Sequence, residues 1–538
     1  MRTGLEHERS VTDGRRRALG YGLCLVGAAI IVFAATWVRW TPPQRAGDLR
    51  PRPDALEYEA GARNLISGRG YCLVVEGRKY PPRYPPGMSM LLAPFLLAWD
   101  GGPGSGIVAV LVMAVAGVIA SMLATGIAAG VLAGLASGAL LAASPAHVRL
   151  SRAVMSEAPS ACLVAVVLLL VVMELRGAAR LARLRPVLLG LTIAVATIVR
   201  LPNVLILAPA IVVLSIFGAQ VRRSAVVVAT CAAGLVPLLL YDALRFGNAF
   251  RTGYAMWVQV PQMQLRYVVT PPGGGGSVPN LAFYAANLGG FGELYPWPWT
   301  IAIVVGAACV FRSGERIERA VAVIAVGFLV LLLATYLPYF WQDARFFVPA
   351  LPPLFVLAAL TLSRRRRILT RGLGGVLIVG GFVALYRSPE LYQPDQFFDE
   401  PGVLRDVAAA TEDNAALFVR TNEYFFSQLV KRRTARLWVP LGLDEHMAAV
   451  HALHLRPIDP ETPKADWIEE GLATEFTPGR AEATIHRLLA TGRPVYLSAL
   501  FGWQVPFFGQ LSDVVRTRFT VREIAAGTYA ISERERTD

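Results

Sequence analysis

Long apolar runs dominate the chain as far as about residue 390, and short polar or basic segments separate them. A helix needs roughly 17 to 25 apolar residues to cross the hydrocarbon of a bilayer, and runs that reach or approach this length predict about eleven transmembrane helices. They lie at 18–39, 105–123, 125–143, 158–175, 186–201, 203–218, 224–244, 297–311, 320–340, 346–363 and 370–388. The first run follows three arginines and lacks a cleavage site of small residues, so we expect a signal anchor.

The composition of the chain excludes a soluble globule. Of its 538 residues, 54% are hydrophobic and only 17% are charged, and the mean hydropathy is +0.48. The net charge of +14 is concentrated in loops beside the apolar runs, which suits an anionic bilayer rather than nucleic acid. The five cysteines are too scattered for a disulfide framework or a thiolate metal site.

Basic residues occur in every other loop. Short loops rich in Lys and Arg stay in the cytoplasm, so we expect the N-terminal tail 1–17 to be cytoplasmic. The first outer loop is then 40–104, and a long outer loop, 245–296, contains the glycine tract 273–276. The first outer loop is itself rich in cations, for which an anionic partner and an Arg-rich composition are equally good explanations.

From about Leu391 the composition becomes that of a soluble protein. Short β-rich stretches alternate with helical patterns, which predicts an α/β domain over residues 391–538. An odd number of spans places this domain outside the cytoplasm. Three histidines in it, His446, His451 and His454, could bind a metal, but a surface helix explains them better because no acid completes the set.

Polar motifs recur on the predicted outer face. In chain order they are Asp54-x-x-x-Tyr58, Tyr84-Pro-Pro-Gly87, Arg152-x-x-Met-x-Glu157-x-Pro159, Arg200-x-Pro-Asn203, Phe246-Gly-Asn248 with Thr252-Gly-Tyr254, and Arg345-Phe-x-x-Pro349-x-x-Pro352. Each motif alone is a weak signal. Acids, cations and aromatic residues gathered at one membrane surface favour chemistry on a lipid-linked phosphate.

This order of motifs resembles the bacterial relatives of protein O-mannosyltransferases and of the lipid A aminoarabinose transferase, which are multi-span glycosyltransferases with a GT-C fold. The resemblance covers about residues 18–390. It implies a polytopic α-helical, GT-C-like domain in the bacterial plasma (inner) membrane. It also implies transfer of a sugar from a polyprenyl-phosphate donor to a glycan, lipid or protein acceptor on the extracytoplasmic face, with inversion at the anomeric carbon.

The resemblance also implies roles for individual residues. Asp54 matches the carboxylate that deprotonates the acceptor hydroxyl, and Glu157 matches a second acid that could orient the acceptor or help to hold a divalent metal. No cofactor is certain. The candidates for the donor phosphate are Lys79, Arg83 and Arg345, and those for contacts to the sugar or carrier are Tyr58, Tyr84 and Asn203. Ala55 stands where the mannosyl branch has a Glu, which leaves the sugar and the metal open.

Simpler roles exist for the same residues. Asp54 and Glu157 could cap helices, since acids are favourable at helix N-termini. Arg345 could anchor a helix at the interface, Lys79 and Arg83 could be solvated, and Tyr84 could belong to an aromatic belt.

Two other classes of protein remain alternatives. A transporter or flippase of lipid-linked sugars places charges near the bilayer midplane, whereas here the predicted spans are nearly free of charge and the polar motifs crowd one rim. A membrane-anchored binding protein would not need so many spans. The placement of charge therefore favours an enzyme.

Overall fold

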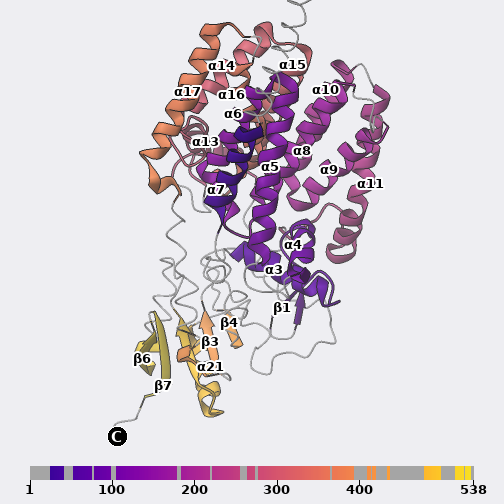
Figure 1. The fold of residues 1–538 in the computed structure, drawn as a ribbon. Coiled ribbons are helices and arrows are strands. Elements are labelled where there is room, and N and C mark those ends of the chain that lie inside the picture. Colours follow the sequence, from indigo (N-terminus) through magenta and orange to yellow (C-terminus); the bar gives the residue numbers. More distant parts are fainter. Residues whose placement is uncertain are drawn as a thin grey trace, which may run out of the picture. The chain divides into compact units, whose positions relative to one another are not determined.

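The structure is a computed structural model, and most of its helices belong to one membrane-type bundle (Figure 1). It describes residues 25–40, 53–75, 78–98, 105–177, 183–218, 221–254, 263–272, 277–363 and 366–392, followed by 407, 409–412, 415–419, 433–436, 478–498, 515–525 and 527–534. The N-terminal tail 1–17, the glycine tract 273–276 and His446, His451 and His454 lie outside these residues.

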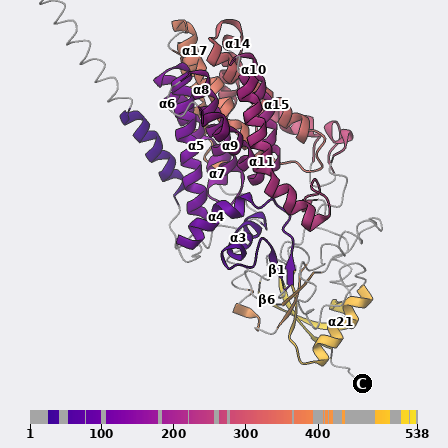
Figure 2. The ribbon, with the colours of Figure 1, turned by 90° about the vertical axis from the view of Figure 1, so that its right-hand side faces the viewer.

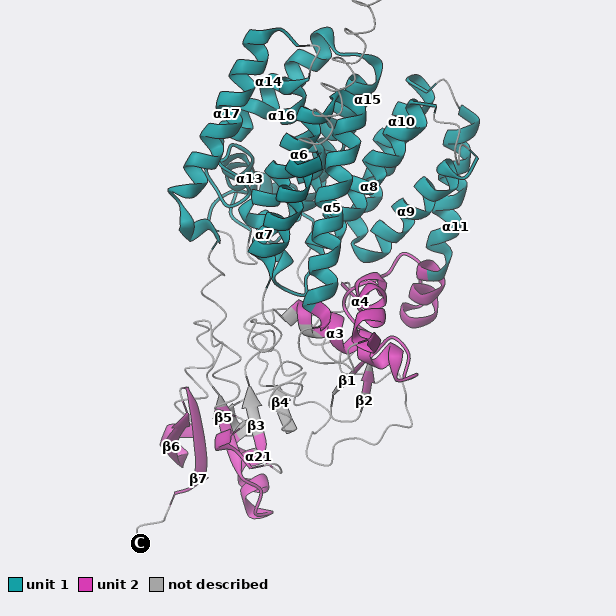
Figure 3. Ribbon diagram, viewed as in Figure 1, with its two compact units in different colours: residues 1–41, 107–237, 261–393 teal, residues 42–106, 238–260, 394–538 magenta. Residues whose placement is uncertain are grey.

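The described chain divides into two compact units (Figure 3). Unit 1 comprises residues 1–41, 107–237 and 261–393, and unit 2 comprises 42–106, 238–260 and 394–538. The domain boundaries predicted from the sequence remain predictions.

Unit 1 consists mainly of helices that follow one another along the chain. The first is an apolar helix, Leu25–Arg39. The first half of the bundle follows with α5 (Ser105–Ala129), α6 (Val131–Ala143), α7 (Pro145–Ser151), α8 (Glu157–Leu175), α9 (Arg185–Val199), η1 (Leu201–Ile206), α10 (Leu207–Ile216) and α11 (Val221–Phe246). The second half comprises η2 (Leu265–Val268), α13 (Asn280–Leu288), α14 (Trp297–Ser313), α15 (Arg316–Tyr336), η3 (Ala344–Ala350), α16 (Leu351–Ala359), η4 (Leu360–Leu362), α17 (Ile368–Tyr386) and η5 (Pro389–Tyr392). The first residues of α5 and the last of α11 belong to unit 2.

Six of the described helices are long and apolar enough to cross a membrane. They are α5, α8, α11, α15, the continuous segment Ala344–Leu362 and α17, and a seventh span exists if α6 and α7, which meet at 61°, count as one. Shorter apolar helices occupy four other predicted spans, namely 18–39, 186–201, 203–218 and 297–311. The chain is therefore a multi-pass helical protein, and the count of about eleven spans remains a prediction.

One predicted boundary between spans is wrong. The sequence placed a break at residue 124, but α5 continues to Ala129 and the break falls at Gly130. Gly130 has φ 108°, a backbone conformation that side chains disfavour and glycine adopts readily. The apolar run does not change in composition there, so hydropathy alone could not locate the break.

The segment Ala344–Leu362 forms the centre of the bundle. In its most apolar window 94% of the residues are buried within the protein. Its helix α16 packs against α6, α8, α14 and α15, and α14 in turn lies beside α17 (Figures 1 and 2). A helix surrounded on all sides by other helices can be apolar all round, as this one is.

Two buried carboxylates are neutralised at one end of unit 1. Glu174, near the end of α8, pairs with Arg223 and, at 3.6 Å, with Arg185. Glu318, in the first turn of α15, accepts hydrogen bonds from Arg366 Nη2 at 2.7 Å and from Ser363 Oγ at 2.9 Å. A buried carboxylate without such partners would be strongly destabilising, so these contacts fasten the helix ends together.

Unit 2 begins with two short helices and a hairpin. Helix α3 (Pro53–Ile66) packs on α4 (Gly87–Ala98), and strands β1 (Leu73–Val75) and β2 (Arg78–Tyr80) pair antiparallel between them. A side chain on Gly61 would come within 2.6 Å of Ser89 Oγ, so the close packing of α3 requires glycine there. This packing holds the chain that carries Asp54 and Arg83.

The described part of residues 394–538 contains a five-stranded sheet and helix α21 (Pro478–Ala490). The strands are β3 (Ala416–Val419), β4 (Arg433–Arg436), β5 (Val495–Ser498), β6 (Phe519–Ala525) and β7 (Thr528–Glu533), in the order β4-β3-β5-β7-β6. β3 is parallel to β4 and β5, whereas β7 is antiparallel to β5 and β6. An α/β domain over the whole of 391–538 remains a prediction, because many of its residues are not described.

The contact between α14 and α16 yields a stability prediction. A Cβ on Gly306 would lie 1.9 Å from the carbonyl oxygen of Leu357 on α16, so Gly306→Ala must push the two helices apart. We expect a loss of about 1–3 kcal/mol in the free energy of unfolding. The matched control is Gly375→Ala on α17, where an added Cβ meets nothing within 4 Å. Thermal unfolding in detergent should show a lower Tm only for Gly306→Ala, and equal Tm values would contradict the packing.

Candidate active site

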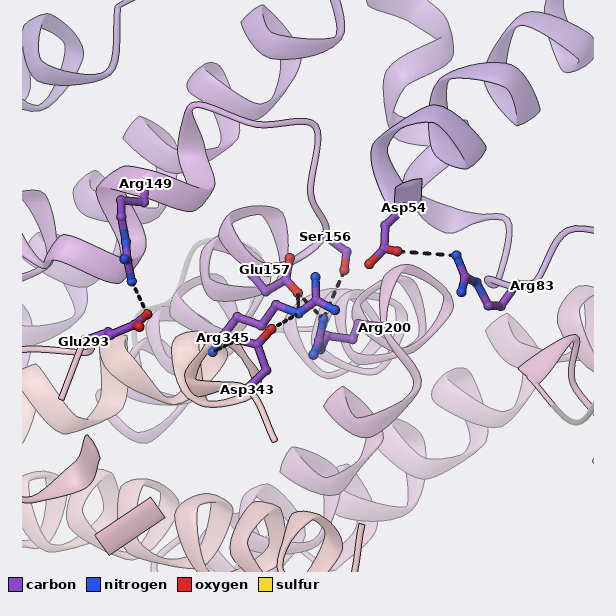
Figure 4. Close-up of polar contacts among 9 residues, drawn as sticks. All are labelled: Asp54, Arg83, Arg149, Ser156, Glu157, Arg200, Glu293, Asp343 and Arg345. Carbon is purple, nitrogen blue, oxygen red and sulfur yellow. Dashed lines mark hydrogen bonds and ion pairs between the residues drawn. The ribbon is translucent and has the colours of Figure 1, made fainter. Parts of the chain in front are cut away.

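Unit 1 brings together Glu157, Arg200 and Arg345 from three separate segments (Figure 4). Glu157 lies in the first turn of α8, Arg200 separates α9 from η1, and Arg345 lies in the first turn of η3. Glu157 Oε1 accepts a hydrogen bond from Arg200 Nη1 at 2.7 Å and lies 3.6 Å from Arg345 Nε. One carboxylate oxygen therefore faces two guanidinium groups.

Asp343 completes this cluster. Its carboxylate accepts the backbone N–H of Arg345 at 2.9 Å, so it caps η3, and it pairs with Arg345 Nε at 2.9 Å. The guanidinium groups also lie against an aromatic ring, with Cζ of Arg200 and Arg345 at 5.4 and 5.8 Å from the centroid of Phe346. The ring and the two acids hold both cations in place.

Exposure differs sharply within the cluster. The side chain of Glu157 is 1% exposed, whereas those of Arg200 and Arg345 are 13% and 18% exposed. The carboxylate of Glu157 is thus the buried counter-ion. The two guanidinium groups and the Asp343 carboxylate, which is 25% exposed, form the part that another molecule can reach. Glu157 holds the two guanidinium groups in place.

Asn203 is fully buried beneath this cluster. Its Nδ2 donates to Ser160 Oγ and to the carbonyl oxygen of Ala196, both at 2.9 Å, and so ties η1 to α8 and α9. These bonds give Asn203 a role in packing, and its Oδ1 has no hydrogen-bond partner among the described residues. The contact with sugar or carrier expected from the sequence stays a prediction.

Unit 2 brings together Asp54, Glu57 and Arg83. Arg83 Nη2 donates to Glu57 Oε1 at 2.6 Å and to Asp54 Oδ1 at 3.4 Å, and the backbone N–H of Arg83 points to Glu57 Oε2 at 3.3 Å (Figure 4 shows the pair with Asp54). The side chain of Glu57 is 4% exposed and that of Asp54 is 14% exposed. The ion pair of Arg83 with Glu57 is therefore closer than its pair with Asp54. Asp54 is the more accessible of the two acids.

Asp54 lies within the first turn of α3, because the helix begins at Pro53. It is therefore not the residue ahead of the helix that the capping alternative required. An acid in a first turn is still favoured by the helix dipole.

Aromatic residues surround Arg83. Its guanidinium lies 4.7 Å from the centroid of the Tyr84 ring, and Tyr84 contacts the rings of Tyr58 and Tyr254 at 4.8 and 5.3 Å. Tyr71 O–H donates to the carbonyl oxygen of Tyr84 at 2.8 Å and so holds the turn that follows. Tyr58 and Tyr84 are both buried, so Tyr84 packs against Arg83 and Tyr58 packs behind Tyr84.

A glycine explains why two distant motifs meet in unit 2. A Cβ on Gly253 would lie 2.2 Å from the carbonyl oxygen of Pro82. The Thr-Gly-Tyr segment can therefore lie directly against the chain before Tyr84 only because residue 253 has no side chain.

Lys79 is separate from these contacts. It lies on β2 opposite Val74 and is half-buried, and the contacts described for it place it beside neither Asp54 nor Arg83.

Burial raises the pKa of Glu57 from 4.5 to about 7, since Arg83 lowers it only in part and Asp54 raises it further. The main physical reason is that burial removes water from the charged carboxylate, and the neighbouring charge of Asp54 adds to this effect, so Glu57 keeps its proton to higher pH. The positive charge of Arg83 is in turn stabilised, and Glu57 is the main cause of the raised pKa of that guanidinium.

A divalent metal shared by Asp54 and Glu157 stays a prediction. Each of these acids pairs with arginine within its own unit. In the described part of the chain no three His, Cys, Asp or Glu residues lie close enough to hold an ion. We therefore derive no step through a metal.

Three charged residues of these clusters, Glu57, Arg200 and Asp343, were given no role from the sequence. Glu57 was visible only as an acid one residue before Tyr58, and Arg200 only as part of a turn between two apolar runs. The available signal was the i, i+3 spacing of Asp54 and Glu57, which places both acids on one face of a helix.

Comparison with known proteins shows similarity in fold. No family model matches the chain, and no curated protein matches it in sequence. Among solved structures, ArnT from Cupriavidus metallidurans bound to undecaprenyl phosphate has a TM-score of 0.62 at 14% identity, over 96% of this chain and 98% of that one. The oligosaccharyltransferase of Archaeoglobus fulgidus, tethered with an acceptor peptide, has a TM-score of 0.56 at 10% identity, over 95% and 74%.

A third similar structure is the arabinofuranosyltransferase AftD from Mycobacteria, with a TM-score of 0.52 at 15% identity, over 95% of this chain and 40% of that one. These proteins are all GT-C glycosyltransferases. The chain therefore has the GT-C fold, as its motifs predicted. Identities this low show the fold alone.

The shared cation of unit 2 generates a prediction about pH. The pKa of Glu57 is 4.5 in the unfolded chain and about 7 in the folded chain, so the folded chain binds the proton more tightly. The stabilisation that protonated Glu57 gives to the fold is therefore complete below pH 4.5 and is lost as the pH rises through 7. In Glu57→Gln this contribution is absent. We expect the stability of the wild type relative to Glu57→Gln to fall by roughly 1.4 kcal/mol per pH unit within that window. Unfolding of both proteins in detergent at pH 4.5, 5.5, 6.5 and 7.5 measures it, and parallel curves would contradict it.

Proposed function

We propose that the protein is a glycosyltransferase that moves a sugar from a polyprenyl-phosphate donor to a hydroxyl acceptor, with inversion and with Asp54 as the general base. The observation that carries this proposal is the pair of acids around Arg83, in which the more exposed carboxylate is Asp54. The fold supports it, since ArnT and the archaeal oligosaccharyltransferase were solved with undecaprenyl phosphate and with a dolichol-phosphate.

The proposed reaction is a single displacement. The acceptor oxygen forms a bond to the anomeric carbon while its proton passes to the Asp54 carboxylate. The bond between the anomeric carbon and the phosphate oxygen breaks, and its electron pair leaves with the polyprenyl phosphate. A phosphate leaving group needs cations rather than an acid, so one carboxylate base is sufficient.

Arg83 supports this role for Asp54. Its guanidinium lies 3.4 Å from Asp54 Oδ1, and an adjacent cation favours the ionised form of a carboxylate. A base must be deprotonated before it can accept a proton from the acceptor. In this proposal Arg83 positions the base, and it remains a further candidate for the donor phosphate.

We assign the donor phosphate to Arg200 and Arg345, with Lys79 as a further candidate. The two arginines are rigidly held and partly exposed, and a guanidinium is suited to bidentate contact with phosphate oxygens. Glu157 then orients these cations. Tyr58 and Tyr84 shape the surroundings of Asp54, and Tyr84 remains the candidate for a contact with the sugar.

We further propose that the donor is a hexosyl or pentosyl lipid and that the reaction takes place at the extracytoplasmic face of the bacterial inner membrane. In this topology the N-terminus is cytoplasmic and residues 391–538 lie outside. The alternation of basic loops along the sequence supports it.

The test is transfer of sugar by purified protein. Asp54→Asn removes the proton acceptor with almost no change in shape, so we expect kcat to fall by at least about a hundredfold. The matched control is Glu59→Gln, which makes the same chemical change on the same helix to an acid that pairs with Arg63 at 4.0 Å. Its kcat should stay within about twofold of the wild type.

A folding defect has a different signature from a catalytic one. If Asp54→Asn binds donor normally and keeps the wild-type Tm, the loss lies in chemistry. Full activity in folded Asp54→Asn would remove Asp54 as the base.

A further inference from the structure

A cavity of about 550 Å³ opens at the other end of unit 1 from Glu157. It is lined by residues 126–133, by Arg176 at the end of α8, by Leu362 and by Arg371 in the first turn of α17. Helix α8 has 19 residues and connects Glu157 to Arg176. At about 1.5 Å per residue this separates them by about 28 Å, close to the thickness of bilayer hydrocarbon. The cavity is therefore distinct from the candidate active site.

The cavity is electropositive. Nε of Arg371 is buried and has no hydrogen-bond partner among the described residues. The guanidinium of Arg176 lies at the same cavity, and one of its nitrogens donates to the carbonyl oxygen of Ile127. Two fixed cations beside one space, with no acid in its lining, favour an anion.

A helix start adds to this potential. Helix α6 begins at the cavity with Val131, and no side chain caps it. The first N–H groups of a helix have no partner within it and carry partial positive charge. The adjacent end of α5 would oppose this effect, but its carbonyls at Gly126 and Ile127 already accept hydrogen bonds.

The rim of the cavity is apolar and exposed. Val131 and Leu132, which line it, are 45% and 60% exposed. Ile368, one helical turn before Arg371, is 76% exposed. In a membrane protein such side chains face acyl chains. A ligand at this place therefore needs an anionic group and apolar chains.

We propose that this cavity binds the phosphate group of an anionic phospholipid, with Arg176 and Arg371 on the phosphate and the acyl chains along the exposed apolar residues of α6 and α17. Basic pockets between helix ends are known to hold lipid head groups. The site lies at the end of unit 1 opposite to Glu157 and does not depend on the proposed transferase activity.

The test compares lipids that differ only in head-group charge. The full-length protein is purified in detergent and titrated with phosphatidylglycerol or with phosphatidylcholine of the same chains, and bound lipid is counted by native mass spectrometry. We expect the wild type to prefer phosphatidylglycerol by about tenfold or more, and Arg371→Gln and the double variant Arg176→Gln with Arg371→Gln to lose most of this preference. Arg371→Gln is the safer variant for folding, because no hydrogen bond of its side chain is described.

The matched control removes two positive charges, as the double variant does, at the same end of unit 1. Arg312→Gln with Arg319→Gln changes two exposed arginines that do not line the cavity and should keep the preference. Equal binding of both lipids by the wild type, or an equal loss in the control, would overturn the proposal. Inorganic phosphate serves as a separate probe, and displacement of the lipid by millimolar phosphate would assign the cavity to a soluble anion instead.

Discussion

The pairing of Glu157 with Arg200 and Arg345 joins three segments that are far apart in the sequence. The start of α8, the end of α9 and the start of η3 meet at one carboxylate oxygen. A buried carboxylate must be paired, so these segments cannot separate without exposing an uncompensated charge. The same constraint operates at the opposite end of unit 1, where Glu174 and Glu318 each hold arginines. The bundle is thus fastened by ion pairs at both ends and by apolar packing between them.

The two clusters use the same residue types for different purposes. In unit 1 Glu157 is buried and its two cations are partly accessible, with Asp343 exposed beside Arg345. In unit 2 one cation is shared by two acids, and the more accessible acid, Asp54, is the group that could accept a proton. This division of roles between a base and a set of cations is what transfer from a lipid phosphate requires. It also argues against a flippase, which would need charges along its path rather than at helix ends.

Much of the fold was predictable because long apolar runs have few alternatives to helices in a membrane. Apolar helices are described within each predicted span, but only six of the described helices, or seven with the bent pair, are long and apolar enough to cross a membrane. The break at Gly130 depends on a backbone angle that hydropathy does not encode. The motifs pointed to Asp54, Glu157, Arg83 and Arg345, whereas burial determined how they differ. The full burial of Asn203 and the commitment of Arg83 to Glu57 are results of tertiary packing, and no spacing in the sequence could have revealed them.

The proposed function requires that the protein break the bond between a sugar and a polyprenyl phosphate. The most direct measurement uses proteoliposomes that contain a panel of radiolabelled polyprenyl-phosphate sugars and follows both release of the sugar and the position of the intact lipid. If the protein is a transferase, we expect one of these sugars to be transferred to an acceptor and free polyprenyl phosphate to accumulate. Movement of the intact lipid-linked sugar across the bilayer without release would contradict it and would identify a flippase.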